Sequence, residues 1–373
     1  MKDLDGILVV ALEQAVAAPY ASNLLAEAGA RVIKIEREEG DFARNYDHLV
    51  KGESAYFVWL NRGKESVVLD VKDPADRMLL FSMLRKADVF IQNLRFGAVE
   101  SLGLDYASLQ EINPRIIMCS ISGYGESGPY ASMKAYDLLV QAETGLSSIT
   151  GTAEGPARVG VSVCDISTGM TAYAAILRSL IRRSRTHKGE HIRLSLFDVM
   201  VDWMNVPLLQ KAYGSVQTKR VGMNHASIAP YGMYYTGDGK GVVFSIQNER
   251  EWKVFCCEIL KDESMVDDSR FNSVGNRVAN RPALDEVINQ VFARYQQSEL
   301  LALLEQHNIA YGRLNTLDNV LAHPQRRKVT VATPAGPIEL TASGVMTDDQ
   351  PPISLPVPAL GQHTESIRDE FGE

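Results

Sequence analysis

The chain contains 373 residues, of which 45% are hydrophobic, and its 46 acidic and 38 basic residues give a net charge of −8. This length predicts two domains, and the negative charge argues against general nucleic-acid binding. No apolar run approaches the roughly 20 residues that span a bilayer, and the first residues, MKDLDGILVV, lack a signal-peptide segment. We therefore expect a cytoplasmic protein with neither membrane nor nucleic acid as a partner.

Strand-like and helix-like segments alternate over the first third of the chain. Residues 6–12 (GILVVAL) form a short apolar run typical of a strand that is buried on both faces. A helix over 20–28 follows and stops at Gly29, and 30–36 (ARVIKIE) predicts the next strand. Further strand candidates cover 66–72, 87–93 and 115–123. This βαβ rhythm predicts a Rossmann-like parallel sheet with right-handed crossovers.

The middle of the chain continues this pattern around one acidic residue, Asp165. A long helix from about Tyr136 and a loop over 151–160 lead to a short apolar segment that resembles the end of a buried strand. The turn at Asp165 then opens a second helix that reaches about Arg185, and 190–204 predicts a strand and a helix.

The last third predicts a smaller α+β domain. A polar, basic stretch over 213–229 is typical of a linker, and 230–247 (PYGMYYTGDGKGVVFSIQ) has two β-rich runs joined by Gly-Asp-Gly, as in a hairpin. Helical segments continue to about Leu321, and a tail rich in proline and glycine, 333–364, is expected to be extended. We place the large domain at 1–200 and 330–373, the small domain at 222–325, and the linkers at 201–221 and 326–329.

The common catalytic and cofactor signatures are absent from this sequence. The first strand-to-helix connection, ALEQAVAAPYA, contains no glycine, so the GxGxxG fingerprint is missing where it should occur. The chain also has no GxxxxGK[ST] loop, GxSxG elbow or HExxH motif. Its four cysteines, Cys119, Cys164, Cys256 and Cys257, show no disulfide or metal-ligand spacing. Redox dinucleotide binding, phosphoryl transfer and metal chemistry are therefore disfavoured.

Basic residues recur where the predicted strands end, namely Arg37, Lys72 and Arg95, and Lys134 follows the fifth strand. The carboxyl ends of parallel strands line one crevice, where ligands bind. Several cations from separate strands would suit a phosphate-bearing ligand such as coenzyme A. For any one of them alone, a solvated surface charge is the more frequent alternative.

Asp165 lies in VGVSVCDISTGMTAYAAIL, among small and apolar neighbours. It could cap the helix that follows, a common role of aspartate. It could instead be a nucleophilic carboxylate, with helix N-terminal amides holding its pKa below the ordinary value of about 3.9. Local sequence alone gives the two roles about equal weight.

Segments along nearly the whole chain resemble the class III CoA-transferases, a family that includes α-methylacyl-CoA racemases. The resemblance rests on the joint order and spacing of LDGILVV, LLAEAGARVIKIE, NRGKESVVLDVK, ADVFIQNLRFGAVESLGLDY, INPRIIMCSISGYGESGPY, AYDLLVQAETGL, CDISTGMTAYAAILRSL, GEHIRLSLFD and GMNHASIAPYGMYYTGDGK. It implies a homodimer of interlocked chains, acyl-CoA and small carboxylic acids as substrates, and no permanently bound cofactor.

The resemblance also implies site residues. The family nucleophile falls on Asp165, which would pass through an acyl anhydride and an aspartyl-CoA thioester. The CoA contacts fall on Val16, Ala17, Arg37, Leu69, Lys72, Asn93, Leu94, Arg95, Met133, Lys134 and Tyr136. We expect oxyanion donors at Gln247 and Asn248, and contacts to a small acceptor acid with a second carboxylate at Arg44 and His225; surface or linker roles are as frequent for the last two.

Three departures from the family pattern bear on the reaction. Ser101 replaces a usual Lys or Arg, and Val16 replaces the glutamine of formyl-CoA transferases. Racemases carry a histidine and a glutamate where this chain has Tyr136 and Gln247, and these residues are poor replacements for an acid/base pair. CoA transfer is therefore the predicted reaction, with racemisation or non-catalytic CoA binding as the alternatives.

Overall fold

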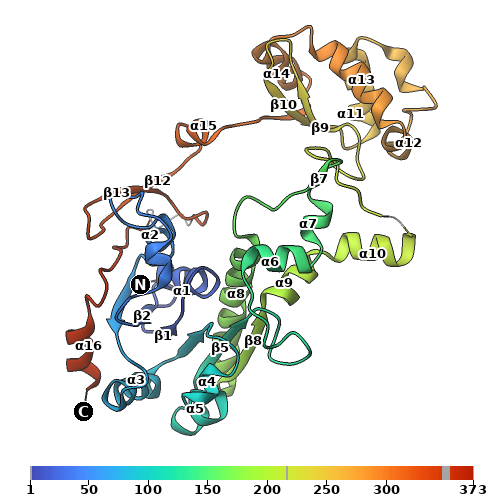
Figure 1. Cartoon of the computed structure of the whole chain (residues 1–373). Helices are drawn as coiled ribbons and strands as arrows, with labels where there is room; N and C mark the ends of the chain where they lie inside the picture. The colour runs from blue at the N-terminus through green and yellow to red at the C-terminus, as the bar shows by residue number, and fades with distance from the viewer. Residues whose placement is uncertain (1, 216, 347–352, 373) are drawn as a thin grey trace. The chain divides into compact units, whose positions relative to one another are not determined.

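The computed structural model describes residues 2–215, 217–346 and 353–372, and the chain divides into two units (Figure 1). The first unit consists of the described residues up to Leu146, Arg158–Leu208, and those from Arg327 onward. The second unit consists of Ser147–Ala157 and Leu209–Arg326. No helix within the described ranges is long and apolar enough to cross a membrane.

A six-stranded parallel sheet forms the centre of the first unit. Its order is β3-β2-β1-β4-β5-β8, which is the strand order of a doubly wound Rossmann-like fold. Its strands are β1 Leu8–Leu12, β2 Arg31–Glu36, β3 Lys64–Val68, β4 Val89–Gln92, β5 Ile117–Ser122 and β8 Glu190–Ser195. In the register, Val10 of β1 lies between Ile33 and Phe90. The predicted Rossmann-like parallel sheet is confirmed.

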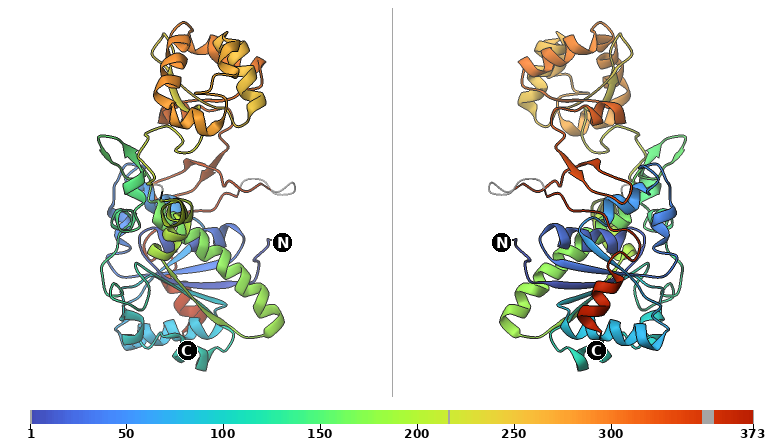
Figure 2. Two further views of the ribbon diagram at one scale, coloured as in Figure 1. Left: turned by 90° about the vertical axis from the view of Figure 1, so that its right-hand side faces the viewer. Right: turned by 90° about the vertical axis from the view of Figure 1, so that its left-hand side faces the viewer.

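Helices cover both faces of this sheet because its strands are apolar on both sides (Figure 2). Val9 and Ala11 pack on one face against α1 Ala17–Glu27 and α8 Val163–Thr186. Val10 and Leu12 pack on the other face. The helices there include α3 Pro74–Lys86, α5 Tyr106–Ile112 and α16 Thr364–Phe371.

Shorter elements complete the first unit. They are η1 Phe42–Asn45, α2 Ala55–Leu60, α4 Ala98–Ser101, α6 Asp137–Glu143, α9 Leu196–Trp203, β12 Lys328–Val331 and β13 Ile338–Thr341, while α7 Leu146–Ile149 and α10 Asn205–Gly214 cross the boundary between the two units.

The second unit has a small antiparallel sheet packed against helices. Its strands are β9 Tyr231–Tyr235, β10 Gly241–Ser245 and β11 Ala310–Arg313, in the order β11-β10-β9, so the predicted hairpin is confirmed. Its core is aromatic, with Phe244, Trp252 and Phe255 fully buried. The remaining elements are β6 Gly151–Thr152, β7 Gly155–Pro156, α11 Glu249–Val254, the π-helix η2 Phe255–Leu260, η3 Glu263–Val266, α12 Val274–Ala279, α13 Arg281–Phe292, α14 Gln297–Gln306 and α15 Leu317–Leu321.

Two sequence predictions around Asp165 are wrong. The long helix from Tyr136 is two short ones, because the chain turns at Gly145 with φ +80°. The segment before Asp165 is not a strand but an irregular loop in which Val161 is exposed. This short apolar run has no neighbouring strand to pair with, so its composition alone was misleading.

Candidate active site

The loops that follow β1 and β4 meet at the point where the strand order of the sheet reverses. Ligands bind at such points in open parallel sheets. Asn93 bridges the two loops, because its Oδ1 accepts the Gln14 N–H at 2.9 Å and its Nδ2 donates to the Gln14 carbonyl at 2.8 Å. These two hydrogen bonds connect the loop after β4 to the loop after β1 and fix the backbone of the latter at Gln14.

A cavity of about 230 Å³ opens at the carboxyl ends of β1, β2 and β3. It brings together three of the predicted CoA contacts, Arg37, Leu69 and Leu94. Arg37 is exposed at its rim, whereas Leu69 is buried. The polar part of its lining includes Glu13, Glu36 and Asp41.

The other predicted CoA contacts fall into two groups. Val16 and Ala17 are buried at the start of α1, next to the Asn93 bridge. The remaining five are Lys72, Arg95, Met133, Lys134 and Tyr136, and all of them are exposed. The two lysines and the arginine among them therefore present their charges to solvent.

Asp165 is the third residue of α8 and is half-buried. The N-cap residue of this helix is Ser162, whose side chain makes no capping hydrogen bond. Asp137 takes over the capping: its Oδ1 accepts the N–H of Cys164 at 2.8 Å and of Asp165 at 3.4 Å. The Asp165 side chain is therefore not the N-cap of α8, although it lies in the first turn of this helix.

Asp137 is itself held by Gln141, one turn further along α6. Gln141 donates from Nε2 to Asp137 Oδ2 at 2.7 Å, and its Oε1 accepts the N–H of Val159 at 2.9 Å. These bonds fasten the loop before Asp165 to α6. A structural role for Asp137 agrees with this geometry.

The electrostatic setting of Asp165 differs from the sequence expectation. Burial, and then the negative charge of Asp137, raise the pKa of Asp165 to about 7, whereas helix amides were expected to lower it. The expectation is wrong because burial disfavours the charged carboxylate, while Asp137 accepts the N–H groups of Cys164 and Asp165 and adds a like charge next to Asp165. At neutral pH the carboxylate is thus poorly stabilised, as a reactive group would be.

The first turns of α8 lie against the start of α1. A Cβ atom placed on Gly169, one turn after Asp165, would be 2.6 Å from the Ala17 carbonyl oxygen, so only glycine permits this contact. The loop after β1 is consequently adjacent to the turn of α8 that carries Asp165.

Tyr46, just after η1, also belongs to this region. Burial and the negative charges of Asp41 and Asp165 raise the pKa of its phenol, so the hydroxyl keeps its proton well into the alkaline range. Sequence reasoning missed Tyr46 and Gln14, since neither lies in a recognisable pattern; the only available signal was their position in loops that follow β1 and β2.

Arg44, expected to contact the acceptor acid, forms an ion pair with Glu36 through two 2.8 Å hydrogen bonds. Its guanidinium also lies over the Phe57 ring at 3.6 Å. A substrate carboxylate would have to compete with Glu36 for this side chain.

The remaining predicted substrate residues, Gln247, Asn248 and His225, belong to the second unit and are exposed. Asn248 caps α11 by accepting the Glu251 N–H at 3.0 Å, and Gln247 donates to Ser245. The His225 ring stacks on Tyr231 at 5.2 Å. Their contact with substrate stays a prediction.

Neither metal ligation nor thiol chemistry is indicated in the described ranges. They contain no group of three or more His, Cys, Asp or Glu side chains that could hold a metal ion. Burial, and then the charges of Asp137 and Asp165, raise the pKa of the Cys164 thiol to about 12, so it is not a nucleophile at neutral pH.

Comparison with known proteins adds an independent set of observations. A family model described as CoA-transferase family III matches residues 4–364. A succinyl-CoA:glutarate CoA-transferase from Mus musculus is 34% identical over 387 residues, covering 99% of this chain and 86% of that protein. An acetyl-CoA:oxalate CoA-transferase from Acetobacter aceti is 33% identical over 372 residues, covering 98% and 95%. A crystal structure of a CAIB/BAIF family protein from Brucella suis matches with a TM-score of 0.86 at 34% identity over 99% of both chains.

Proposed function

The chain belongs to CoA-transferase family III, and from this premise we propose that it moves CoA from an acyl-CoA thioester to a small dicarboxylate, with Asp165 as the nucleophile. The observation that carries this proposal is the setting of Asp165. Its carboxylate is half-buried, Asp137 caps the helix in its place, and the charged group that acts on it is the acid Asp137 rather than a cation.

A carboxylate nucleophile conserves the activation of the acyl group. Asp165 attacks the thioester carbonyl of the donor, which gives a mixed anhydride and releases the CoA thiolate. The thiolate attacks the aspartyl carbonyl, which gives an aspartyl-CoA thioester and frees the donor acid. The acceptor carboxylate then reverses both steps. A serine ester in the same place would be too stable to return the acyl group to CoA.

The donor CoA is proposed to bind at the carboxyl ends of the strands. Arg37, Leu69 and Leu94 line the cavity there, and the exposed Lys72, Arg95 and Lys134 supply positive charge for phosphates. The loop Gln14–Val16 lies between this cavity and α8, because Gln14 lines the cavity and the neighbouring Ala17 contacts Gly169. This arrangement supports a thioester that reaches from the cavity toward Asp165.

The acceptor is proposed to be a dicarboxylate. The relatives described above are named for transfer to glutarate and to oxalate, which are both dicarboxylates. We also propose that the protein is a homodimer. In the second unit, Gln247 and Asn248 are proposed to donate to the oxyanions and His225 to contact the acceptor acid.

Trapping with hydroxylamine tests the nucleophile. We expect the enzyme incubated with succinyl-CoA and hydroxylamine to carry a hydroxamate on Asp165, detected by peptide mass spectrometry. The Asp165→Ala variant is expected to lose CoA exchange by about 10⁴-fold or more while it still binds CoA.

Asp198→Asn is the matched control, because Asp198 is the third residue of α9, as Asp165 is of α8, but it accepts a hydrogen bond from Ser195 at 2.5 Å. It should exchange CoA at the parent rate. Substantial turnover in Asp165→Ala, or deuterium incorporation at the α-carbon without an acceptor acid, would count against the proposal.

A further inference from the structure

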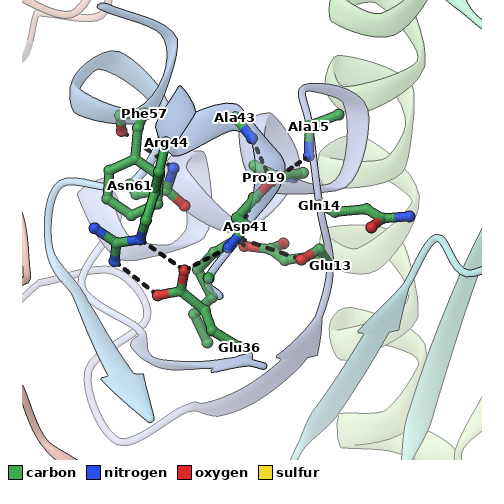
Figure 3. A network of polar contacts seen from close by, with 12 residues as sticks. Glu13, Gln14, Ala15, Pro19, Glu36, Asp41, Ala43, Arg44, Phe57 and Asn61 are labelled. Atoms are coloured by element: carbon green, nitrogen blue, oxygen red, sulfur yellow. Dashed lines mark hydrogen bonds and ion pairs between the residues drawn. The ribbon is translucent and has the colours of Figure 1, made fainter. Parts of the chain in front are cut away.

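Six charged side chains are packed together beneath the loop after β1 (Figure 3). Three are cations and three are anions, so the group is neutral. We call it the buried charge cluster; its members are Glu13, Lys34, Glu36, Asp41, Arg44 and Lys64. The two lysines, Glu13 and Asp41 are fully or almost fully buried.

Asp41 connects this cluster to two backbone segments. Its Oδ2 accepts a hydrogen bond from Lys34 at 2.9 Å. Its Oδ1 accepts the N–H of Ala15 at 3.1 Å and of Ala43 at 2.9 Å. One carboxylate therefore holds both the loop after β1 and the first turn of η1, which leads to Tyr46.

The loop after β1 needs such support because Ala15 has a left-handed backbone, with φ +65°. A residue with a Cβ adopts this conformation only at a cost, so it persists where surrounding contacts enforce it. The Asn93 bridge fixes Gln14 on one side of Ala15, and Asp41 fixes the Ala15 N–H itself. In Figure 3, the Gln14 side chain points away from the cluster, to the side where α8 runs.

We propose that Asp41 is a positioning residue for the acylation of Asp165: by accepting the Ala15 and Ala43 N–H groups, it holds the loop Gln14–Val16 and the turn before Tyr46 in the arrangement that the reaction requires. This inference rests on the proposed function. Lys34 has the supporting task of balancing the Asp41 charge, since an unpaired buried carboxylate would destabilise the fold.

Two electroneutral double variants isolate the backbone acceptor from the charge. Lys34→Met with Asp41→Asn removes both charges and keeps an oxygen for Ala15. Lys34→Met with Asp41→Leu removes both charges and the oxygen. In succinyl-CoA:glutarate exchange, we expect kcat of the Asn variant within about threefold of the parent. We expect kcat of the Leu variant to be about 10- to 100-fold lower, with KM for succinyl-CoA changed by less than about threefold.

If Asp41 had a purely structural role, its loss would lower the stability of the fold without lowering kcat at a nearly unchanged KM. Asp88→Asn is the matched control. Like Asp41, Asp88 pairs with a buried cation, in this case Arg183 at 2.7 Å, and accepts a backbone N–H, that of Leu8. Unlike Asp41, it lies at the amino ends of the strands. It should leave kcat unchanged. If the Leu variant does not fold, Asp41→Ala with Lys34→Met replaces it.

Equal kcat values for the Asn and Leu variants, whether both high or both low, overturn the inference. Adding Ala15→Gly to the Leu variant provides a second test. Glycine adopts the left-handed conformation without strain, so it should restore part of the lost kcat; no recovery also counts against the inference. Exchange that survives in Asp165→Ala would instead overturn the proposed function, so the two failures are distinguishable.

Discussion

Two groups of buried acids in the first unit have opposite electrostatic character. In the buried charge cluster, burial alone would raise the pKa of Glu36, but Arg44 and Lys34 outweigh it and lower the pKa to about 2. The pKa of Glu13 is likewise lowered by Lys64 and Lys34, against the effect of burial. At Asp165, burial and Asp137 act in the same direction, and the pKa rises to about 7.

The difference is the presence of a partner of opposite charge. Every carboxylate of the cluster lies within 3 Å of a cationic nitrogen, whereas the charged group that acts on Asp165 is a second acid, Asp137. Paired acids hold loops in place, whereas an acid without a cationic partner is ionised at an energetic cost to the fold, as is typical of reactive carboxylates. Burial by itself therefore does not distinguish a structural acid from a reactive one.

The largest effect on stability is expected from removing one cation of the cluster. Lys34→Met leaves three buried carboxylates with two cations, so we expect the free energy of unfolding to fall by about 3–5 kcal/mol. Adding Asp41→Asn should recover at least half of this loss, because the cluster is neutral again. Urea denaturation at pH 7 measures both values.

Lys188→Met, at an exposed position after α8, is the control and should change stability by less than about 0.5 kcal/mol. A loss below about 1 kcal/mol in Lys34→Met would mean that the cluster is not the tightly coupled group described above.

The opposite result is expected at Asp165, where removing the charge should stabilise the protein. The pKa of the Asp165 carboxyl is about 7 in the folded chain against 3.8 for an ordinary aspartate. Ionisation of this group therefore lowers the free energy of unfolding by up to about 4 kcal/mol, or by about 2–3 kcal/mol when screening by solvent is included. Asp165→Asn should therefore be more stable than the parent at pH 8. The gain should shrink as pH falls from about 7 and vanish below about 4, as followed by denaturation at several pH values.

Asp47 provides a control of opposite sign. Backbone N–H groups of Leu49 and Ala55 lower the pKa of Asp47, so Asp47→Asn should destabilise the protein at pH 7 and have no effect well below pH 4. A destabilised Asp165→Asn at pH 8 would contradict the comparison between the two groups of acids.

Sequence alone predicted the strands and most helices because their patterns are local. The apolar run before Glu13 and the alternation with helices were sufficient for the parallel sheet. The helix from Tyr136 was wrong because Gly145 breaks it, and the supposed strand before Asp165 was wrong because strand pairing is a long-range property.

The candidate site was only partly predictable for a related reason. Resemblance supplied Asp165 and the expected CoA contacts, but the rise in the pKa of Asp165 comes from its burial and from Asp137, 28 residues earlier in the chain, and both depend on the folded structure. Asp41 lies 26 residues after Ala15, whose N–H it accepts. No sequence pattern marks such pairs, since only the folded sheet brings their loops together.

The smallest expected effect is a shift in the pH dependence of the reaction, and it addresses the contribution of Asp137 directly. A nucleophilic Asp165 must be ionised, so kcat/KM for succinyl-CoA should rise with pH through about 7 and then level off. Asp137→Asn keeps an oxygen for the Cys164 and Asp165 amides but removes the neighbouring charge. The rising limb should therefore move to lower pH, while burial, the larger cause, keeps it above the ordinary range. Asp198→Asn should leave the limb in place. An unmoved limb in Asp137→Asn would assign the raised pKa to burial alone, and the contrast with the cluster would then rest on missing cations rather than on the added acid.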